Sequence, residues 1–419
     1  MIGLVAVTAA GRAAAADLAA RWPEETVQLP GPTAAAAVAD GWRRCTALVC
    51  FLATGATVRL VAPLLADKHT DPAVVCVDEA RRFAVALTGG HAGGANALAE
   101  RVAAALGATP VVTTASDRAG LAGLDTLGWP VAGDVAGVGR ALLDGEPVWL
   151  RADRGYPLPA LGAQVGEHPG AAYTLHVTDR VVPPAPGVAV LHPPTLVLGA
   201  GAARGVAAAE VLDLVDAALA GAGLAAASVH HVATVAAKAG EAGLLAAAER
   251  RGWPVVAHPA ADLAAVAVPS PSPVVQAAVG TPSVAEAAAL HDADELVVPK
   301  RKSAAATVAV ARRRLPGRLA LVGLGPGARD LLTPRARAEL ARAAVVVGLD
   351  QYVDQVRDLL RPGTRILASG LGSEEERART AVAEARRGLA VALVGSGDAG
   401  VYAMASPALG YAGDADSAA

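Results

Sequence analysis

Short apolar runs alternate with alanine-rich helical stretches from the first residues of this chain, and no other feature limits its fold as strongly. The apolar run 2–8 is followed by a helical stretch to about Trp22, and a second helical stretch near 33–42 leads into the apolar run 46–52. This alternation is typical of α/β domains, and strands that are apolar throughout are typical of parallel sheets covered on both faces. The sequence therefore predicts α/β domains with parallel or mixed sheets flanked by helices, and a parallel sheet for the first of them.

The same pattern changes along the chain and divides it into four parts. With 419 residues the chain is long enough for two to four domains of about 100–150 residues each. We expect one α/β domain at 1–127, a second at 195–312 and a further unit at 317–419. The periodicity weakens at 128–194, where five prolines fall between positions 181 and 194, and we interpret this segment as a small irregular module with a linker.

The overall composition argues against several classes of protein. Hydrophobic residues make up 53% of the chain, but alanine supplies nearly half of them, and no stretch offers about 20 bulky apolar residues in a row. We therefore expect no membrane span, and the apolar first residues, which carry no basic leader, are interpreted as a strand. A net charge of −3 argues against a general nucleic-acid binder. Three cysteines without metal-type spacing fit a reducing cytoplasm.

A glycine-rich motif, Thr-Gly-Gly-His-Ala-Gly-Gly-Ala-Asn at 88–96, lies between an expected strand and an expected helix. The glycines around His91 let the backbone approach a ligand, and the start of a helix directs amide groups towards an anion. The motif therefore predicts a site for an anionic substrate group. The alternative is a tight turn in which His91 merely caps the helix.

The cluster Asp67, Lys68, His69, Thr70 and Asp71 places two carboxylates, an ammonium and an imidazole within five residues. Such a group is suited to general acid/base catalysis. The alternatives are a solvated helix end and, for Asp71 before a proline, the start of a turn.

These residues belong to a longer pattern that resembles the signature of the cobalt-precorrin-5A hydrolases, the CbiG family of the anaerobic cobalamin pathway. A similar likeness extends over about 195–312, although a turn at 199–205 lacks the cysteine and one basic residue that family members often carry and keeps Arg204. The residues that carry the resemblance are Thr54-Gly55, Val58-Arg59, 62–65, Asp67-Lys68, 70–75, Gly90-His91, 93–96, 280–289, 299–302 and 306–310.

The resemblance implies cytoplasmic hydrolysis of a lactone on an anionic, cobalt-containing tetrapyrrole, with release of acetaldehyde. It implies that His91 or the pair Asp67 and Asp71 supplies the base, and that amides near Gly93 and Gly94 stabilise negative charge. Candidate partners for the substrate's carboxylates are lysines, although Lys300 and Lys302 could instead form a solvated exit from the domain. The substrate-binding residues implied are Thr54, Gly55, Lys68, Gly90, Gly93, Gly94, Asn96, Lys300 and Lys302.

No cofactor is expected for the hydrolase. No bound metal is expected either, because the histidines lack ligand spacing such as His-x-x-x-His beside a carboxylate, and cobalt would arrive inside the substrate.

A second glycine-rich turn, Gly-Leu-Gly-Pro-Gly at 323–327, follows the apolar run that opens the last unit. A turn of this kind suits close approach to a nucleotide-like cofactor, but is weak by itself. With the motif Ser-Gly-Asp-Ala-Gly-Val-Tyr at 396–402 it resembles the tetrapyrrole methylases, closest to the precorrin-3B C-17 methyltransferase type. The resemblance implies a pocket for S-adenosylmethionine lined by Gly323, Gly325, Pro326, Gly327, Gly397, Asp398 and Tyr402.

The last unit is about half as long as the methylases it resembles, and we expect it to be one lobe of that fold. The tail after Pro407 departs from the family pattern, and we expect no methyl transfer by this chain alone. Two alternatives stay open. One is a bifunctional hydrolase and methyltransferase completed by another chain. The other is a non-catalytic tetrapyrrole-binding protein that hands intermediates between enzymes of the corrin pathway.

Overall fold

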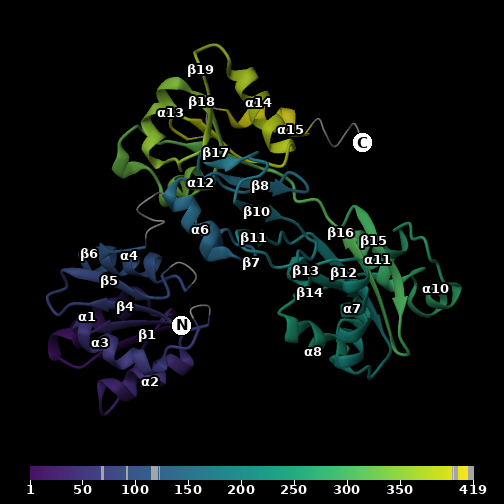
Figure 1. Cartoon of the computed structure of the whole chain (residues 1–419), viewed down its shortest axis with the longest axis horizontal. Coiled ribbons are helices and arrows are strands. Elements are labelled where there is room, and N and C mark those ends of the chain that lie inside the picture. Colours follow the sequence, from purple (N-terminus) through teal and green to yellow (C-terminus); the bar gives the residue numbers. More distant parts are fainter. Residues whose placement is uncertain are drawn as a thin grey trace. The chain divides into compact units, whose positions relative to one another are not determined.

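The computed structural model describes residues 1–67, 70–90, 93–114, 121, 123–398, 400 and 404–413. The chain forms two compact units, Met1–Thr126 and Leu127–Ala419. The described residues form four sheets flanked by helices, which confirms the predicted α/β class (Figure 1). Three of the predicted site residues, Lys68, His91 and Tyr402, lie outside the described residues. Within the described ranges no helix has both the length and the apolar character needed to cross a bilayer.

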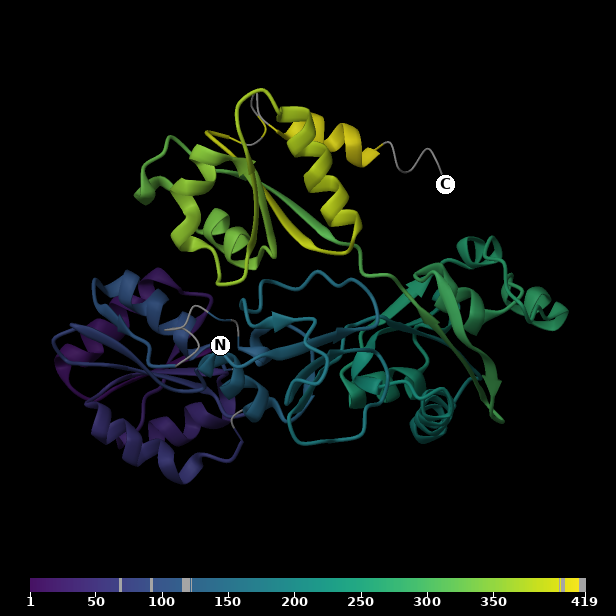
Figure 2. The ribbon, with the colours of Figure 1, turned by 45° about the horizontal axis from the view of Figure 1, so that its top comes forward.

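The first unit is one sheet of order β2-β1-β3-β4-β5-β6 with helices on both faces. Apolar residues of α1 and α4 cover one face, and those of α2 and α3 cover the other, as Figure 2 shows for the helices drawn in purple and blue. The elements are β1 (Ile2–Ala6), α1 (Ala9–Arg21), β2 (Thr26–Gln28), α2 (Ala34–Arg44), β3 (Ala47–Phe51), α3 (Thr54–Val61), β4 (Ala73–Val77), β5 (Phe83–Thr88), α4 (Ala95–Leu106) and β6 (Thr109–Val111).

The prediction of a fully parallel sheet for this unit is wrong, because β5 runs antiparallel to β4. The connection 78–82 is too short for the crossover of about a dozen residues that parallel strands need. It closes as a tight turn, in which the Phe83 amide donates to Asp78 Oδ1 over 2.7 Å and Arg81 adopts a φ of 56°. As a result the carboxyl ends of β5 and β6 lie at the edge where β1, β3 and β4 begin.

The segment interpreted as an irregular module is an ordered sheet of order β7-β11-β10-β8-β9. Its strands are short and several are half-exposed, which explains why their periodicity is weak. Asp134 caps the helix by accepting from the Gly137 amide over 2.8 Å and accepts from the Gly187 amide over 2.8 Å. The elements are β7 (Val131–Gly133), α6 (Val135–Asp144), β8 (Val148–Ala152), β9 (Val165–Gly166), β10 (Tyr173–Val177) and β11 (Val188–Leu191).

The third sheet has the order β14-β13-β12-β16-β15 and is also mixed. Helices α7 and α8 pack on one face and α11 on the other. The turn expected at 199–205 begins later, because β12 continues to Ala202. The elements are β12 (Leu196–Ala202), α7 (Ala208–Gly221), β13 (Val229–Val235), α8 (Ala242–Arg251), β14 (Val255–His258), α9 (Ala260–Ala264), α10 (Pro273–Val279), α11 (Val284–His291), β15 (Glu295–Lys302) and β16 (Ala306–Arg312).

The last sheet is parallel throughout, with the order β17-β20-β18-β19. Helices α12 and α13 cover one face, and α14 and α15 the other. Of the tail after Pro407 the structure describes residues 408–413, which are helical, and α15 buries Ala408 against the sheet. The elements are β17 (Arg318–Gly323), α12 (Pro334–Arg342), β18 (Val345–Leu349), α13 (Asp350–Val356), β19 (Arg365–Ser369), α14 (Glu374–Arg386), β20 (Ala390–Gly395) and α15 (Ala405–Gly413).

Candidate functional site

The glycine loop, of which the structure describes residues 89, 90, 93 and 94, lies between β5 and α4 and needs glycine at several of these positions. Gly89 and Gly94 adopt φ values of 72° and 79°, a region that disfavours side chains. A Cβ on Gly93 would lie 2.8 Å from the Gly89 carbonyl oxygen, so the loop folds closely on itself. The Ala95 amide donates to Gly89 and the Asn96 amide to Gly90, over 3.0 and 3.1 Å. Two of the first amides of α4 are therefore engaged by the loop.

The acidic turn, of which the structure describes residues 66, 67, 70 and 71, lies beside the glycine loop at the same edge of the sheet. Asp71 accepts hydrogen bonds through Oδ2 from the Ala66 amide over 2.9 Å, and its own amide donates to the Asp67 carbonyl over 2.8 Å. The turn leads directly into β4, and a Cβ on Gly89 would lie 3.1 Å from the Ala73 Cα. Asp71 thus shapes a turn, as the alternative expected, while standing next to the glycine loop.

Asn96 connects the glycine loop to the segment after β6 through a hydrogen bond. Its Nδ2 donates to Thr114 Oγ1 over 2.7 Å. A Cβ on Gly90 would lie 3.3 Å from Asn96 Oδ1, so the Asn96 amide group stands directly over the loop. The structure therefore brings Asp67, Asp71, the glycine loop and Asn96 to one edge of the first sheet.

Thr54 and Gly55 lie at the opposite edge of this sheet. They begin α3 just after β3, and Thr54 Oγ1 is 3.7 Å from Cys76 Sγ near the carboxyl end of β4. Because Asp71 precedes the amino end of that strand, the length of β4 separates the two groups. Binding of substrate by Thr54 and Gly55 stays a prediction, and in this sheet they belong to a different surface from the glycine loop.

A hollow of about 420 Å³ opens at the glycine-loop edge. Arg101 at its rim pairs with Glu25 over 2.8 Å, and its guanidinium lies 4.5 Å from the centre of the Trp22 ring. Sequence reasoning missed Arg101, although it lies two helical turns after Gly94 on the same helix and so faces the same side. Residues lining the hollow include Met1, Thr46, Ala73, Gly93, Gly94 and Arg101.

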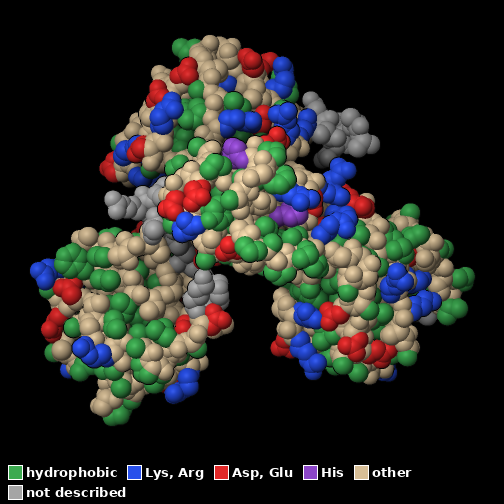
Figure 3. Space-filling model, viewed as in Figure 1, with side chains coloured by type: hydrophobic (Ala, Val, Ile, Leu, Met, Phe, Trp, Pro, Cys, Tyr) green, Lys and Arg blue, Asp and Glu red, His purple; other side chains and the backbone are tan. Residues whose placement is uncertain are grey.

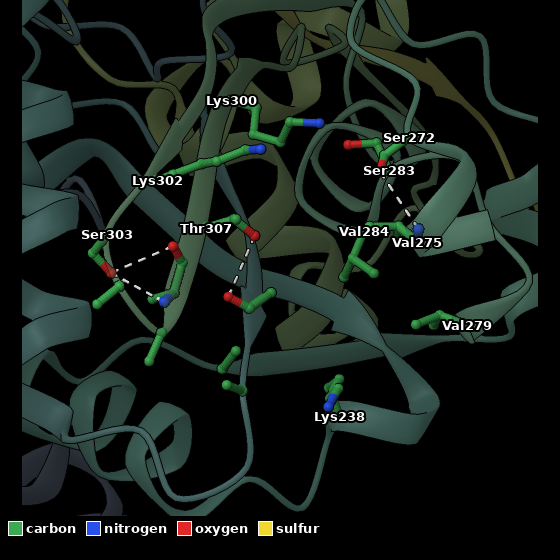
Figure 4. A pocket seen from close by; sticks show the side chains of 16 residues that line it. Lys238, Ser272, Val275, Val279, Ser283, Val284, Lys300, Lys302, Ser303 and Thr307 are labelled. Carbon is green, nitrogen blue, oxygen red and sulfur yellow. Dashed lines mark hydrogen bonds between the residues drawn. The ribbon is translucent and has the colours of Figure 1, made fainter. Parts of the chain in front are cut away.

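A second hollow, of about 340 Å³, lies between β15, β16 and α10 in the other unit and gathers three lysines (Figure 4). Lys300 donates through Nζ to the Ser270 carbonyl over 2.7 Å. The side-chain ammonium groups of Lys238 and Lys302 make no ion pair or hydrogen bond with any residue that the structure describes. The chain contains only four lysines against 32 arginines, a rarity that could have identified Lys238, which sequence reasoning overlooked.

The buried carboxylate of Glu286 holds the rim of this lysine hollow in place. The side chain is 0% exposed, and its two oxygens accept from the amides of Ser270 and Lys300 over 3.1 and 3.0 Å. These bonds join α11 to β15 and to the loop before α10. The geometry of Lys300 therefore depends on Glu286, which lies in the family-like run 280–289 but was not predicted as a site residue.

The glycine turns of the last unit meet at the carboxyl ends of the neighbouring strands β17 and β20. Gly325 and Gly397 exchange two backbone hydrogen bonds of 3.1 and 2.9 Å. Gly325, Gly327 and Gly397 have φ values of 67°, 105° and 62°. A Cβ on Gly327 or Gly397 would meet nothing within 4 Å, so the surface of the turns is open.

Of the residues predicted to line the cofactor pocket, the structure brings together the turn 323–327, including Pro326, with Gly397 and Asp398. Asp398 Oδ1 accepts from the Gly400 amide over 2.7 Å. Open glycine turns at adjacent parallel strand ends fit a nucleotide-like cofactor such as S-adenosylmethionine.

A histidine cluster on the α11 side of the third sheet was not predicted. Asp292 Oδ2 lies 2.8 Å from His231 Nε2 and 2.9 Å from His258 Nε2, and Oδ1 lies 3.0 Å from His291 Nδ1. Burial lowers the pKa of His231. Burial also opposes ionisation of Asp292, but hydrogen bonds from His291 and His231 outweigh it, and the Asp292 pKa lies below its ordinary value.

Charged side chains of both signs are mixed over the face seen in Figure 3. This distribution differs from the single-sign basic surface of general nucleic-acid binders.

Comparison with known proteins identifies both parts of the chain. Residues 36–117 match the family profile described as cobalamin synthesis G N-terminal, and residues 196–311 match cobalamin synthesis G C-terminus. A cobalt-precorrin-5A hydrolase of Priestia megaterium is 33% identical over 293 residues, which are 63% of this chain and 78% of that protein. The chain belongs to the cobalamin synthesis G family. The resemblance to this family is confirmed, and this cobalamin synthesis G chain is an enzyme of cobalamin biosynthesis.

The last unit of this cobalamin synthesis G chain matches a second family. Residues 318–415 match the tetrapyrrole (corrin/porphyrin) methylases, so the prediction that the family pattern ends at Pro407 is wrong. The cobalamin biosynthesis protein CobIJ of Mycobacterium tuberculosis is 44% identical over 118 residues, 28% of this chain. The matched stretch spans 23% of that relative. The predicted fusion of hydrolase-family and methylase-family parts is confirmed.

A solved structure of a putative cobalamin biosynthesis protein G homolog from Sulfolobus solfataricus is also similar to this chain. It is 20% identical and covers 75% of this chain and 97% of its own, with a TM-score of 0.31. The family assignment rests on the sequence matches and not on this superposition.

Proposed function

We propose that this chain hydrolyses the lactone of cobalt-precorrin-5A and releases acetaldehyde, giving cobalt-precorrin-5B. Family membership supports this, because the chain covers 78% of a relative that carries the name cobalt-precorrin-5A hydrolase. The observation that carries the proposal is the meeting of the acidic turn and the glycine loop at one sheet edge. A carboxylate beside closely approachable backbone is suited to activating water for attack on an ester carbonyl.

The proposed reaction needs a base and donors for a negative oxygen. Water adds to the lactone carbonyl and the acyl–oxygen bond breaks, which leaves a carboxylate and an alcohol. The alcohol then loses its proton and the carbon–carbon bond to the ring breaks, so its oxygen becomes the acetaldehyde carbonyl while the electron pair stays on the ring. Asp67 or Asp71 would take the proton from water, with His91 as the other candidate, and amides near Gly93 and Gly94 would donate to the oxyanion.

The substrate is an anionic tetrapyrrole, and its carboxylates require cationic partners. Lys238 and Lys302 are suited to this role together with Lys300, because their ammonium groups have no partner among the described residues. Lys68 remains a predicted partner outside the described residues.

Acetaldehyde release tests the proposal directly. The chain is incubated with cobalt-precorrin-5A, and acetaldehyde is followed by a coupled alcohol dehydrogenase. Asp71→Asn should lower the rate by about 10²–10⁴-fold if Asp71 is the base. Asp40→Asn is the matched control. Asp40 is a carboxylate of the same unit, and its side chain accepts hydrogen bonds from Arg43 and Arg44 on its own helix.

The outcomes separate the competing functions. Binding of the tetrapyrrole without acetaldehyde release would refute the hydrolase proposal and favour a hand-off protein. If Asp71→Asn and the wild type release acetaldehyde at equal rates, Asp71 is not the base. Asp67→Asn and His91→Ala then test the two other candidates in the same assay.

We also propose that the last unit binds S-adenosylmethionine at its two glycine turns. The open surfaces of Gly327 and Gly397 support this, because a methyl-donor nucleoside needs close backbone approach there. S-adenosylmethionine would supply an electrophilic methyl group. Calorimetry should detect binding that Gly327→Val abolishes, with Gly370→Val, another site where a Cβ meets nothing within 4 Å, as control. Transfer of labelled methyl to a precorrin-3B-type tetrapyrrole would favour the bifunctional alternative, and binding without transfer would favour the hydrolase alone.

A further inference from the structure

Three ligand-type side chains converge in the third sheet without taking part in the proposed reaction. One ring nitrogen of His258, one ring nitrogen of His291 and a carboxylate oxygen of Asp292 all lie within 4.8 Å of one another. The His258 and His291 rings lie 4.2 Å apart between centroids and are tilted by 36°. Both imidazoles therefore direct a nitrogen to the same carboxylate, one to each of its oxygens.

The framework around these side chains holds them in place. His258 ends β14, whereas His291 ends α11 and Asp292 is its C-cap (Figure 1). The two elements are fixed relative to each other, because α11 is buried along 284–289 against the sheet of which β14 is part. The convergence is thus fixed by two packed elements of the domain and not by a loop.

His231 orients the carboxylate from the buried side. It is 4% exposed and its Nε2 lies 2.8 Å from Asp292 Oδ2. A hydrogen-bonded partner that fixes the orientation of a ligand is a regular feature of protein metal sites. His231 itself contacts His230, whose Nδ1 lies 2.7 Å from His231 Nδ1 and 3.1 Å from a guanidinium nitrogen of Arg313.

We propose that His258, His291 and Asp292 bind a divalent transition-metal ion of the Zn²⁺ or Co²⁺ type, with His231 as a positioning residue. The present nitrogen–oxygen distances of 2.9 and 3.0 Å are a few tenths of an ångström shorter than the roughly 3.3 Å between ligands around a tetrahedral ion with bonds of about 2.0–2.1 Å. The three ligand atoms as a set lie within 4.8 Å of one another, so the side chains have to rotate to reach such separations around an ion.

The donor set selects the class of metal. Two imidazoles and one carboxylate suit Zn²⁺, Co²⁺ and related ions better than Mg²⁺ or Ca²⁺, which prefer oxygen ligands alone. The His291 side chain is 33% exposed, so the site is open to solvent on that side. Three protein ligands with an open position leave room for a water molecule. When the ion binds, each neutral imidazole carries its proton on the ring nitrogen that faces away from the metal, and no further reactant is needed.

Cobalt titration of the full chain tests the site. The protein is first stripped with a chelator, and Co²⁺ binding is followed by its visible d–d absorption and by calorimetry, with Zn²⁺ as competitor. We expect one high-affinity equivalent that Zn²⁺ displaces. His291→Ala and His291→Gln should each weaken binding by about a hundredfold or more. Both variants should fold, because His291 is on the surface. His168→Ala, a histidine of the middle module, is the control and should bind as the wild type does.

Thermal unfolding supplies a second measurement. Because the ion binds only the folded domain, Zn²⁺ should raise the Tm of the wild type and of His168→Ala but not that of His291→Ala. Co²⁺ binding of equal strength in the wild type and both His291 variants would overturn the proposal. So would the lack of d–d absorption in the wild type, which would leave the cluster as a hydrogen-bond network. Neither measurement depends on acetaldehyde release. Each of the two proposals, the metal site and the hydrolase activity, can therefore be refuted without affecting the other.

Discussion

Replacing Gly199 with alanine tests how closely α11 must pack against β12. A Cβ at this position would overlap the Ala285 carbonyl oxygen and lie 2.7 Å from the Ala289 amide nitrogen, whereas real Cβ atoms essentially never come closer than 3.0 Å. The obstructing atoms belong to the backbone of a helix, so no side-chain rotation relieves the overlap. The whole of α11 has to withdraw from the sheet.

The cost of this withdrawal can be worked out from the packing. Overpacking a core costs about 1–3 kcal/mol. Residues 284–289 of α11 are all buried, so moving the helix disturbs contacts along its length, and we expect about 3 kcal/mol. For a domain of about 100–150 residues each kcal/mol corresponds to roughly 4 °C, so the Tm of this domain should fall by roughly 10 °C.

Scanning calorimetry of the full chain measures the effect. Only the transition that belongs to residues 195–312 should shift, and the Co²⁺ affinity should fall with it, because α11 carries His291 and leads into Asp292. Gly221→Ala is the matched control, since its Cβ would meet nothing within 4 Å at the end of α7. A Gly199→Ala protein that unfolds within about 2 °C of the control would refute the reasoning.

Three further predictions concern buried or paired groups. Glu286→Ala removes the acceptor of two backbone amides and should destabilise the same domain by about 2–4 kcal/mol in urea unfolding, whereas Glu286→Gln, which keeps one acceptor, should cost less. Burial raises the pKa of Cys50 to about 12, so this thiol should resist iodoacetamide at pH 8 in the native protein and react after unfolding; native labelling at Cys50 would contradict this. The hydrogen bond from Arg318 lowers the pKa of Glu339 below its ordinary value of 4.5, so its stabilising contribution is present above that value and is lost as the pH falls through the lower folded pKa. Glu339→Gln should therefore flatten stability against pH below about 4.5, and an unchanged profile would count against the pairing.

The first sheet shows which parts of the fold were predictable. Its strands and helices follow from alternating apolar runs, because burial of one face of each element imposes that pattern. The direction of β5 was missed, although the short connection 78–82 already required an antiparallel pair. The middle module was missed for a different reason: strands as short and half-exposed as β7 and β8 leave too little pattern to detect.

The candidate site was predictable only where its residues are contiguous. The glycine loop and the acidic turn were identified from sequence, and their neighbouring positions follow from the antiparallel pairing of β4 and β5. Thr54 and Gly55 belong to the same motif in sequence, yet they lie at the other edge of the sheet because α3 crosses it. Residues that belong to one sequence motif therefore do not all lie on the same surface of the domain.

The sequence alone determined the α/β class, the two families and the glycine turns, because periodicity and turn chemistry act within a few residues. Only the tertiary structure decided which distant groups meet. Glu286 reaches the amides of Ser270 and Lys300, and His258 reaches Asp292, because strand order and the close packing of α11 on β12 bring separate segments into contact. A local sequence pattern cannot predict these contacts, because they depend on the direction and register of elements that are far apart in the chain.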